Sequence, residues 1–186
     1  QRYGVWSLDM EAAACGAAVA GPLRGCKRIA HFRGPLLAQN SIDRFLGYKE
    51  ALEENNFTYD SSLVYICECG DSSFEEGKFN AKKLIQDHDD IDGVFINTDL
   101  VAIGALTVFT EMGIKVPDDI SIVGFSNWFM ASVISPSLTT INQPGFKMGK
   151  AAFKQLYKEL NQRKKNSPIV YKKIILETEL VKRDST

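Results

Sequence analysis

Polar and aromatic side chains recur directly after the apolar runs that are predicted to be buried strands. In chain order they are Asn40, Ser41, Arg44, Ser72, Thr98, Asp99, Ser126, Asn127 and Trp128. Hydroxyls, a carboxylate, amides, a guanidinium and an indole together suit a polyhydroxylated ligand, because polar groups hold hydroxyls and a flat ring covers the apolar face of a sugar. The pattern therefore indicates binding of a small polar molecule.

Three of these residues have a structural alternative. Asp99 lies at the start of a predicted helix and could serve only as its cap. Trp128 could be a core or interface residue, because large aromatic side chains dominate both environments. Arg44 lies on the same predicted helix as Ile42 and Phe45, so it could lie on the surface instead of in a pocket. The sequence alone leaves both interpretations of each residue open.

Motifs of the common enzyme classes are absent. The chain contains no G-x-S-x-G, no H-E-x-x-H and no P-loop, and it lacks the G-x-G-x-x-G of dinucleotide enzymes. The acidic cluster at residues 87–92 precedes a predicted strand, which is the wrong end of a sheet for a pocket. We therefore expect neither an enzyme nor a cofactor.

The cysteines predict free thiols rather than a disulfide or metal framework. They are Cys15, Cys26, Cys67 and Cys69. The last two are too close for a normal disulfide along a strand, and their spacing is not C-x-x-C. Only His31 and His88 could join them as zinc ligands, so we expect no metal site and buried thiols in a reducing cytosol.

Composition and charge are those of an ordinary globular protein. The hydrophobic fraction is 45% and the net charge is −1. No apolar run approaches the ~20 residues that span a bilayer, and residues 1–9 lack the pattern of a signal peptide. A domain that held DNA by itself would usually be basic, and the basic run at residues 163–165 is typical of a solvated loop. We expect a cytoplasmic protein that does not bind DNA through this segment alone.

Short β-type runs alternate with amphipathic stretches along most of the chain. The predicted strands are residues 28–32, 63–67, 93–97, 120–125, 138–142 and 173–181. The predicted helices are residues 41–55, with Ser41 as the N-cap, a helix capped at 71–73 that continues to about 85, and residues 100–112 and 146–160. Such alternation predicts βαβ units and a mostly parallel α/β sheet, whose ligands bind beyond the carboxyl ends of the strands.

Several segments together resemble the LacI/GalR family of bacterial transcription regulators. They are RIAHFRGP at residues 28–35, SIDRFLGY at 41–48, residues 93–106, GIKVPDDISIVGF at 113–125, LTTINQP at 138–144 and ELVKRDST at 179–186. Each piece is weak evidence, whereas the combination is specific. One departure stands at Ser126-Asn127-Trp128, where many members carry an acidic pair after the "VGF" motif.

The resemblance implies a two-lobed, periplasmic-binding-protein-like fold of type I, with parallel sheets flanked by helices and an incomplete N-terminal lobe. Residues 1–59 and 143–163 would form the N-terminal lobe, and residues 60–142 and 164–186 the C-terminal lobe. The helix-turn-helix DNA-binding head would be absent. Family effector contacts carry over to Arg44, Asn40, Ser41, Ser72, Thr98, Asp99, Ser126 and Asn127, and Asp9 would match a cleft aspartate.

The function implied by the resemblance is effector sensing. The domain would form a homodimer, bind a sugar or similar small metabolite between the lobes, and control operator binding allosterically through the missing head. The alternative is a free periplasmic sugar-binding receptor of a transport system, which shares the fold. The segments at residues 138–144 and 179–186 favour the regulator.

Overall fold

The computed structural model describes residues 23, 25–68, 73–165, 174 and 176–186. Asp9 and Ser72 therefore lie outside the described residues, as do Cys15 and Cys69. Of the described cysteines, Cys26 is half-buried and Cys67 is buried. None of the described helices combines the length and apolar character that crossing a membrane requires.

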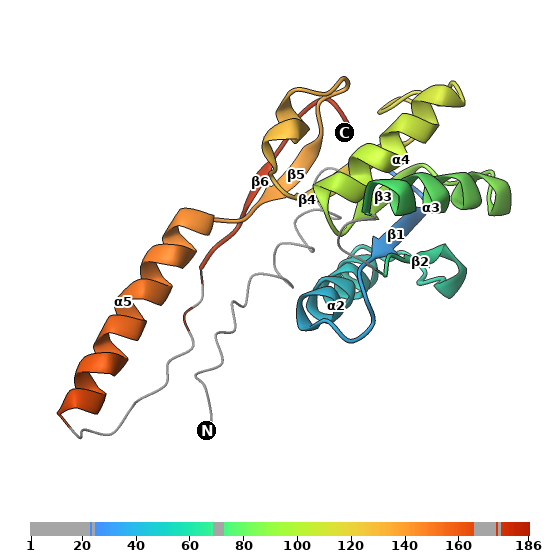
Figure 1. Cartoon of the computed structure of the whole chain (residues 1–186). Helices are drawn as coiled ribbons and strands as arrows, with labels where there is room; N and C mark the ends of the chain where they lie inside the picture. The colour runs from blue at the N-terminus through green and yellow to red at the C-terminus, as the bar shows by residue number, and fades with distance from the viewer. Residues whose placement is uncertain (1–22, 24, 69–72, 166–173, 175) are drawn as a thin grey trace.

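In the part of the chain that the structure describes, the strands form a six-stranded sheet with the order β2-β1-β3-β4-β5-β6 (Figure 1). The strands are β1 Ile29–Arg33, β2 Val64–Ile66, β3 Gly93–Ile96, β4 Ser121–Ser126, β5 Thr139–Asn142 and β6 Glu179–Val181. The helices are α2 Gln39–Glu54, α3 Ser73–Asp87, α4 Asp99–Glu111 and α5 Gly145–Lys164, with short 3-10 turns η1 Ser61–Leu63 and η2 Phe129–Ser132.

The sheet is parallel except at one edge. β1 pairs with β2 and β3, β3 with β4, and β4 with β5, all in parallel. β6 runs antiparallel to β5, and its three residues pair with the last three of β5. The predicted α/β class is thus confirmed. Of the predicted strand at residues 173–181, residues 179–181 form β6, positions 174 and 176–178 are not strand, and residues 173 and 175 lie outside the described residues.

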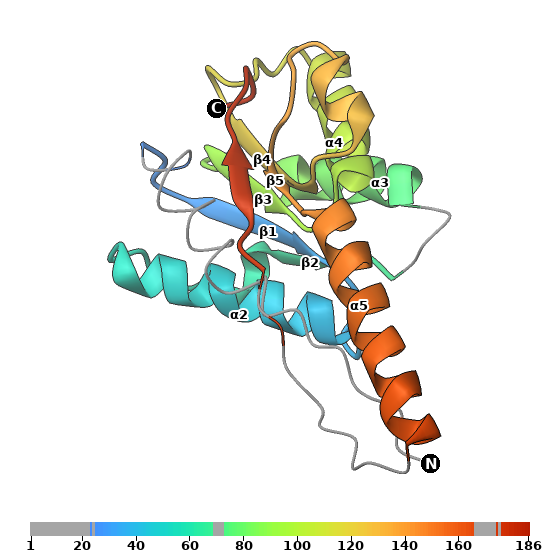
Figure 2. The same cartoon turned by 90° about the vertical axis from the view of Figure 1, so that its left-hand side faces the viewer.

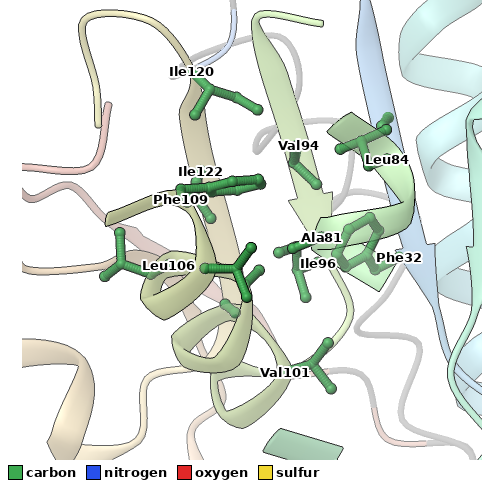
Figure 3. Close-up of a cluster of buried hydrophobic side chains, with 14 of the residues drawn as sticks. Phe32, Ala81, Leu84, Val94, Ile96, Val101, Leu106, Phe109, Ile120 and Ile122 are labelled. Atoms are coloured by element: carbon green, nitrogen blue, oxygen red, sulfur yellow. The ribbon is translucent and has the colours of Figure 1, made fainter. Parts of the chain in front are cut away.

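Two apolar layers cover the two faces of the sheet. Side chains alternate along the strands, so that Phe32, Ile96 and Ile122 pack with α3 and α4. Figure 3 shows Leu106 and Phe109 of α4 directed towards this face of the sheet. The opposite face packs against α2, with a cluster formed by Ile29, Tyr48, Ala51, Leu52, Phe95, Val123, Phe125 and Ile141.

Two helices differ in length from their predicted ranges. α2 begins at Gln39, and its N-cap Ala38 makes no side-chain cap hydrogen bond. Ser41 is therefore not the cap: it lies inside the first turn, where its backbone N–H donates to Ala38 O at 2.9 Å, and its side chain is buried. α5 continues to Lys164, four residues beyond the predicted end near Leu160.

The sheet corrects the lobe boundary expected near Tyr59. A boundary there would place residues 1–59 and 60–142 in different lobes, yet β1 from the first range pairs with β2 and β3 from the second. The hydroxyl of Tyr48 on α2 also donates to Ile29 O at 2.7 Å. A sheet and the helices packed on it share one hydrophobic core. The described residues on both sides of Tyr59 therefore belong to one unit, and the boundary there is wrong.

α5 stands apart from the layers around the sheet (Figures 1 and 2). Gln155 is the only buried residue among its described positions, whereas Phe146, Phe153 and Tyr157 are exposed. An amphipathic helix normally buries its apolar side against another element. The assignment of residues 143–163 to a second lobe stays a prediction.

Candidate ligand-binding site

The carboxyl ends of the parallel strands place most of the predicted ligand residues along one edge of the sheet. Thr98 and Asp99 follow β3, and Asn127 and Trp128 follow β4. Asn97, the residue after β3, also belongs to this edge, because its backbone N–H donates to Phe32 O of β1 at 2.9 Å. The topology thus confirms that these segments, distant in sequence, form one surface.

Arg44 points from α2 towards this edge rather than into solvent. Its side chain is buried, with the residue 6% exposed. Its Nη1 donates to Asn97 O at 2.7 Å, and the guanidinium carbon lies 3.8 Å from the centre of the Phe125 ring. The surface interpretation of Arg44 is therefore wrong. The Asn97 carbonyl and the face of the Phe125 ring hold the planar guanidinium in one orientation. That orientation fixes the directions of its other N–H groups.

A first pocket of about 310 Å³ opens beside Arg44. We call it the Arg44 pocket; it is lined by Pro35, Ala38, Asn40, Ser41, Arg44, Cys67, Glu68, Ser73, Asn97, Thr98 and Val101. These residues come from the loop after β1, the start of α2, the end of β2, the start of α3 and the β3–α4 turn. The volume is at the lower limit of typical small-molecule sites.

Two polar atoms at the Arg44 pocket have no hydrogen-bond partner among the described residues. They are the buried Ser41 Oγ and Asn97 Oδ1. Both side chains pack closely against the backbone of Gly34. A Cβ at that position would come 2.5 Å from Asn97 Nδ2 and 3.2 Å from Ser41 Oγ, so glycine makes this packing possible. Buried polar groups are nearly always paired. A hydroxyl-bearing ligand would satisfy both atoms.

A second pocket of about 260 Å³ adjoins the first at Thr98. We call it the Trp128 pocket; its other lining residues are Asp99, Leu100, Ser126 and Trp128. The indole is 43% exposed and meets the Phe129 ring edge-on at 5.1 Å between centroids. Trp128 is thus not a core residue, and its ring borders a pocket as a stacking platform would.

Asp99 is not a simple helix cap. Thr98 occupies the N-cap position of α4, and its side chain accepts the Val101 N–H at 3.5 Å. The buried Asp99 carboxylate accepts Thr140 Oγ1–H and the Trp128 backbone N–H, each at 2.6 Å. Burial raises the pKa of the Asp99 carboxyl, and these hydrogen bonds act in the opposite direction. The described contacts make Asp99 an anchor for the loop after β4.

Asn127 is also engaged by protein groups. Its Oδ1 accepts from Arg183 Nη2 at 2.7 Å, and its Nδ2 donates to Asn142 Oδ1 at 3.2 Å. Asn127 lines neither of the two pockets. Ser126 and Asn127 have φ angles of 124° and 51°, a region that side-chain-bearing residues rarely adopt. The loop therefore has an unusual backbone that these hydrogen bonds hold in place.

The predicted site residues divide into three groups. Those that line a pocket are Asn40, Ser41, Arg44, Thr98, Asp99, Ser126 and Trp128. Asn127 supports the loop, and Asp9 and Ser72 lie outside the described residues. The pattern missed Glu68 and Cys67 at the end of β2, although their place after a strand is the same signal that identified Thr98. It also missed Arg183, for which no local signal exists.

Comparison with known families agrees with this architecture. Residues 23–186 match the family model of the periplasmic binding protein-like domain. The ribose operon repressor of Halalkalibacterium halodurans is 33% identical over 163 residues, which are 88% of this chain and 46% of the repressor. The chain belongs to the LacI family of periplasmic-binding-protein-like effector domains.

Solved structures of LacI-family regulators share the fold. The transcriptional regulator CelR in complex with cellobiose superposes with a TM-score of 0.87 at 29% identity, over 98% of this chain and 54% of that one. The transcription regulator CcpA of Lactococcus lactis gives 0.81 at 30% identity, over 96% of this chain and 63% of that one. The chain spans about half the length of the curated LacI-family relatives it matches. These relatives are named as transcriptional regulators and not as enzymes, in agreement with the expectation of a non-enzymatic domain.

Proposed function

We propose that this LacI-family domain binds a sugar or similar small metabolite at the Arg44 and Trp128 pockets. The observation that carries the proposal is the pairing of a buried guanidinium with two unsatisfied polar atoms, Ser41 Oγ and Asn97 Oδ1, beside a half-exposed indole. Polar groups that converge next to an aromatic ring match the alternating hydroxyl and C–H surfaces of a carbohydrate. In this proposal Arg44, Asn40, Ser41, Thr98, Ser126 and Trp128 contact the ligand, while Asp99 and Asn127 support them.

In the whole protein, the bound ligand acts as an effector of transcription. The lobes have different relative orientations in the free and bound states, and the ligand favours the orientation it binds more tightly. DNA-binding heads carried by a cytoplasmic homodimer respond to that orientation. The curated relatives, named as operon repressors and regulators, support this proposal over a free transport receptor.

The proposal is tested by calorimetric titration of the whole chain with ribose, cellobiose and a panel of further sugars. Arg44→Lys keeps the charge but loses the planar fork, so we expect about ten- to hundredfold weaker binding of any sugar that binds the parent. Glu50→Ala, an exposed change on the same helix, is the matched control and keeps full affinity. Unchanged affinity of Arg44→Lys, or no binding across the panel, would contradict the proposal.

A further inference from the structure

Arg183 holds the C-terminal segment against the sheet through both backbone and side chain. Its backbone N–H donates to Thr139 Oγ1 at 2.8 Å, and its Nη1 donates to Leu138 O at 2.7 Å. The other arm of the guanidinium, Nη2, donates to Asn127 Oδ1 at 2.7 Å. One side chain thus joins the entry of β5 to the loop that follows β4.

The orientation of the Asn127 amide follows from its partners. A guanidinium can only donate, so the amide oxygen must face Arg183 and the amide nitrogen must face the other way. That nitrogen donates to Asn142 Oδ1 at 3.2 Å. The Asn127 amide thus uses its oxygen for one neighbour and its nitrogen for the other, so one side chain pairs with a donor and an acceptor at once.

The two partners of Asn127 lie at the end of β5, before α5, and just beyond β6, which follows α5 among the described elements. Asn142 is the last residue of β5, which leads directly into α5, and Arg183 follows the end of β6, the next strand after α5. Figure 2 shows β5 and β6 side by side, with α5 continuing from the end of β5. Asn127 itself stands between Ser126 and Trp128, which line the Trp128 pocket.

We propose that Arg183 is a positioning residue of the ligand site: through the Asn127 amide it ties the Ser126–Trp128 loop to both strands that flank α5. The proposal rests on the proposed function, since it names a residue that shapes the same site without contacting the ligand. Any ligand-driven shift of this loop then changes the hydrogen bonds to Asn142 and Arg183. The position of the loop is therefore energetically coupled to the position of the strand that leads into α5.

The backbone of the loop explains why such a tie is needed. Ser126 and Asn127 both have positive φ angles, and strained conformations of this kind persist only where the surroundings hold them. Two backbone hydrogen bonds also restrain this loop: Asn127 N–H donates to Thr140 Oγ1, and Trp128 N–H donates to the Asp99 carboxylate. The competing explanation is that Arg183 only adds to global stability.

Amide hydrogen exchange of the whole chain separates the two explanations, because local openings expose individual amides without global unfolding. We expect Arg183→Met to accelerate exchange of the Asn127 and Trp128 amides by about ten- to hundredfold, the worth of a charged hydrogen bond. Amides of α3 and α4 should keep their rates. Asn127→Ala should also accelerate exchange of the Trp128 amide, and the double variant should accelerate it by less than the product of the two single effects, because both changes remove the Arg183–Asn127 bond.

Arg28→Met is the matched control, since Arg28 forms ion pairs with Asp60 and Asp90 before the start of β1 and does not contact the loop. Unchanged Asn127 and Trp128 amides in Arg183→Met would overturn the proposal. Equal acceleration at α3 and α4 would also overturn it, because that result marks a purely global effect. The exchange rates are measured without ligand. Failure of the sugar titration therefore contradicts the proposed function, whereas the exchange rates alone decide whether Arg183 holds the loop.

Discussion

The Asp99 carboxylate accepts the backbone N–H of Trp128 at 2.6 Å, so a buried residue at the start of α4 positions a half-exposed indole at the edge of a pocket. The other oxygen of the same carboxylate accepts Thr140 Oγ1–H from β5. Three segments that are far apart in the chain therefore meet at one side chain. This arrangement explains how a loop with positive φ angles can present Ser126 and Trp128 in a defined geometry.

Asp99→Asn tests this anchor. The amide retains one acceptor but places an N–H₂ group against either Thr140 or Trp128, both of which donate. We expect the free energy of unfolding to fall by about 1–3 kcal/mol, the cost of a buried group left unsatisfied, as measured by urea denaturation. Asp118→Asn, in an exposed turn, is the control. Equal stability of the Asp99 and Asp118 variants would show that the carboxylate is not an anchor.

Trp128→Ala separates a ligand contact from a packing residue. Because the indole is 43% exposed, its removal should cost far less than the ~3–5 kcal/mol of a buried large aromatic. If the ring stacks on a sugar, affinity for the sugars that bind should fall about tenfold, as expected for an aromatic contact of roughly 1.4 kcal/mol. Val133→Ala is the control, because Val133 is exposed and lines neither pocket. Normal calorimetric affinity of Trp128→Ala would remove the stacking role.

Gly124→Ala tests the close approach of β4 to Asp99. A Cβ at Gly124 would lie 2.4 Å from Asp99 Oδ1 and 2.9 Å from Leu138 Cδ2. We expect a loss of about 1–3 kcal/mol, typical of overpacking, seen as a lower melting temperature. Gly145→Ala meets nothing within 4 Å and lies at the start of α5, so it should be neutral or slightly stabilising. Similar melting temperatures for the two variants would refute the clash.

Burial of His31 should lower the free energy of unfolding in mild acid. The ring is fully buried and stacks with the rings of Tyr48 and Phe95, and its Nδ1 lies 2.9 Å from Phe95 O. Burial lowers the pKa of His31 to about 3 from 6.5. The unfolded chain therefore binds a proton at a pH where the folded chain does not, so the free energy of unfolding falls as the pH drops from 6.5 towards 3.

The His31 contribution is measured by urea denaturation at a series of pH values. It should reach roughly 1.4 kcal/mol per pH unit within this window. His31→Phe keeps a flat ring in the stack and removes the titrating group, so its stability should depend less steeply on pH over the same range. Parallel pH profiles of the parent and His31→Phe would show that His31 does not cause the acid sensitivity.

Periodicity and strand-end position made much of this protein predictable from its sequence. The apolar runs and the spacing of the helices determine the α/β class, because a strand buried on both faces must be apolar and a crossover helix must bury one side. Parallel strands bring their carboxyl ends to one edge. For this reason Arg44, Thr98 and Trp128 are candidates for one surface from the sequence alone, although other positions for Arg44 and Trp128 stay open at that level.

Tertiary structure determines which protein groups each of these residues contacts. Whether β1 shares a sheet with β2 depends on strand pairing across many residues, which no local pattern encodes, and this pairing overturned the boundary near Tyr59. Asp99 and Asn127 look like ligand contacts in the sequence, yet their polar atoms face Trp128, Asn142 and Arg183. Side-chain hydrogen bonds depend on distances of a few ångströms between distant segments, and only the folded chain sets those distances.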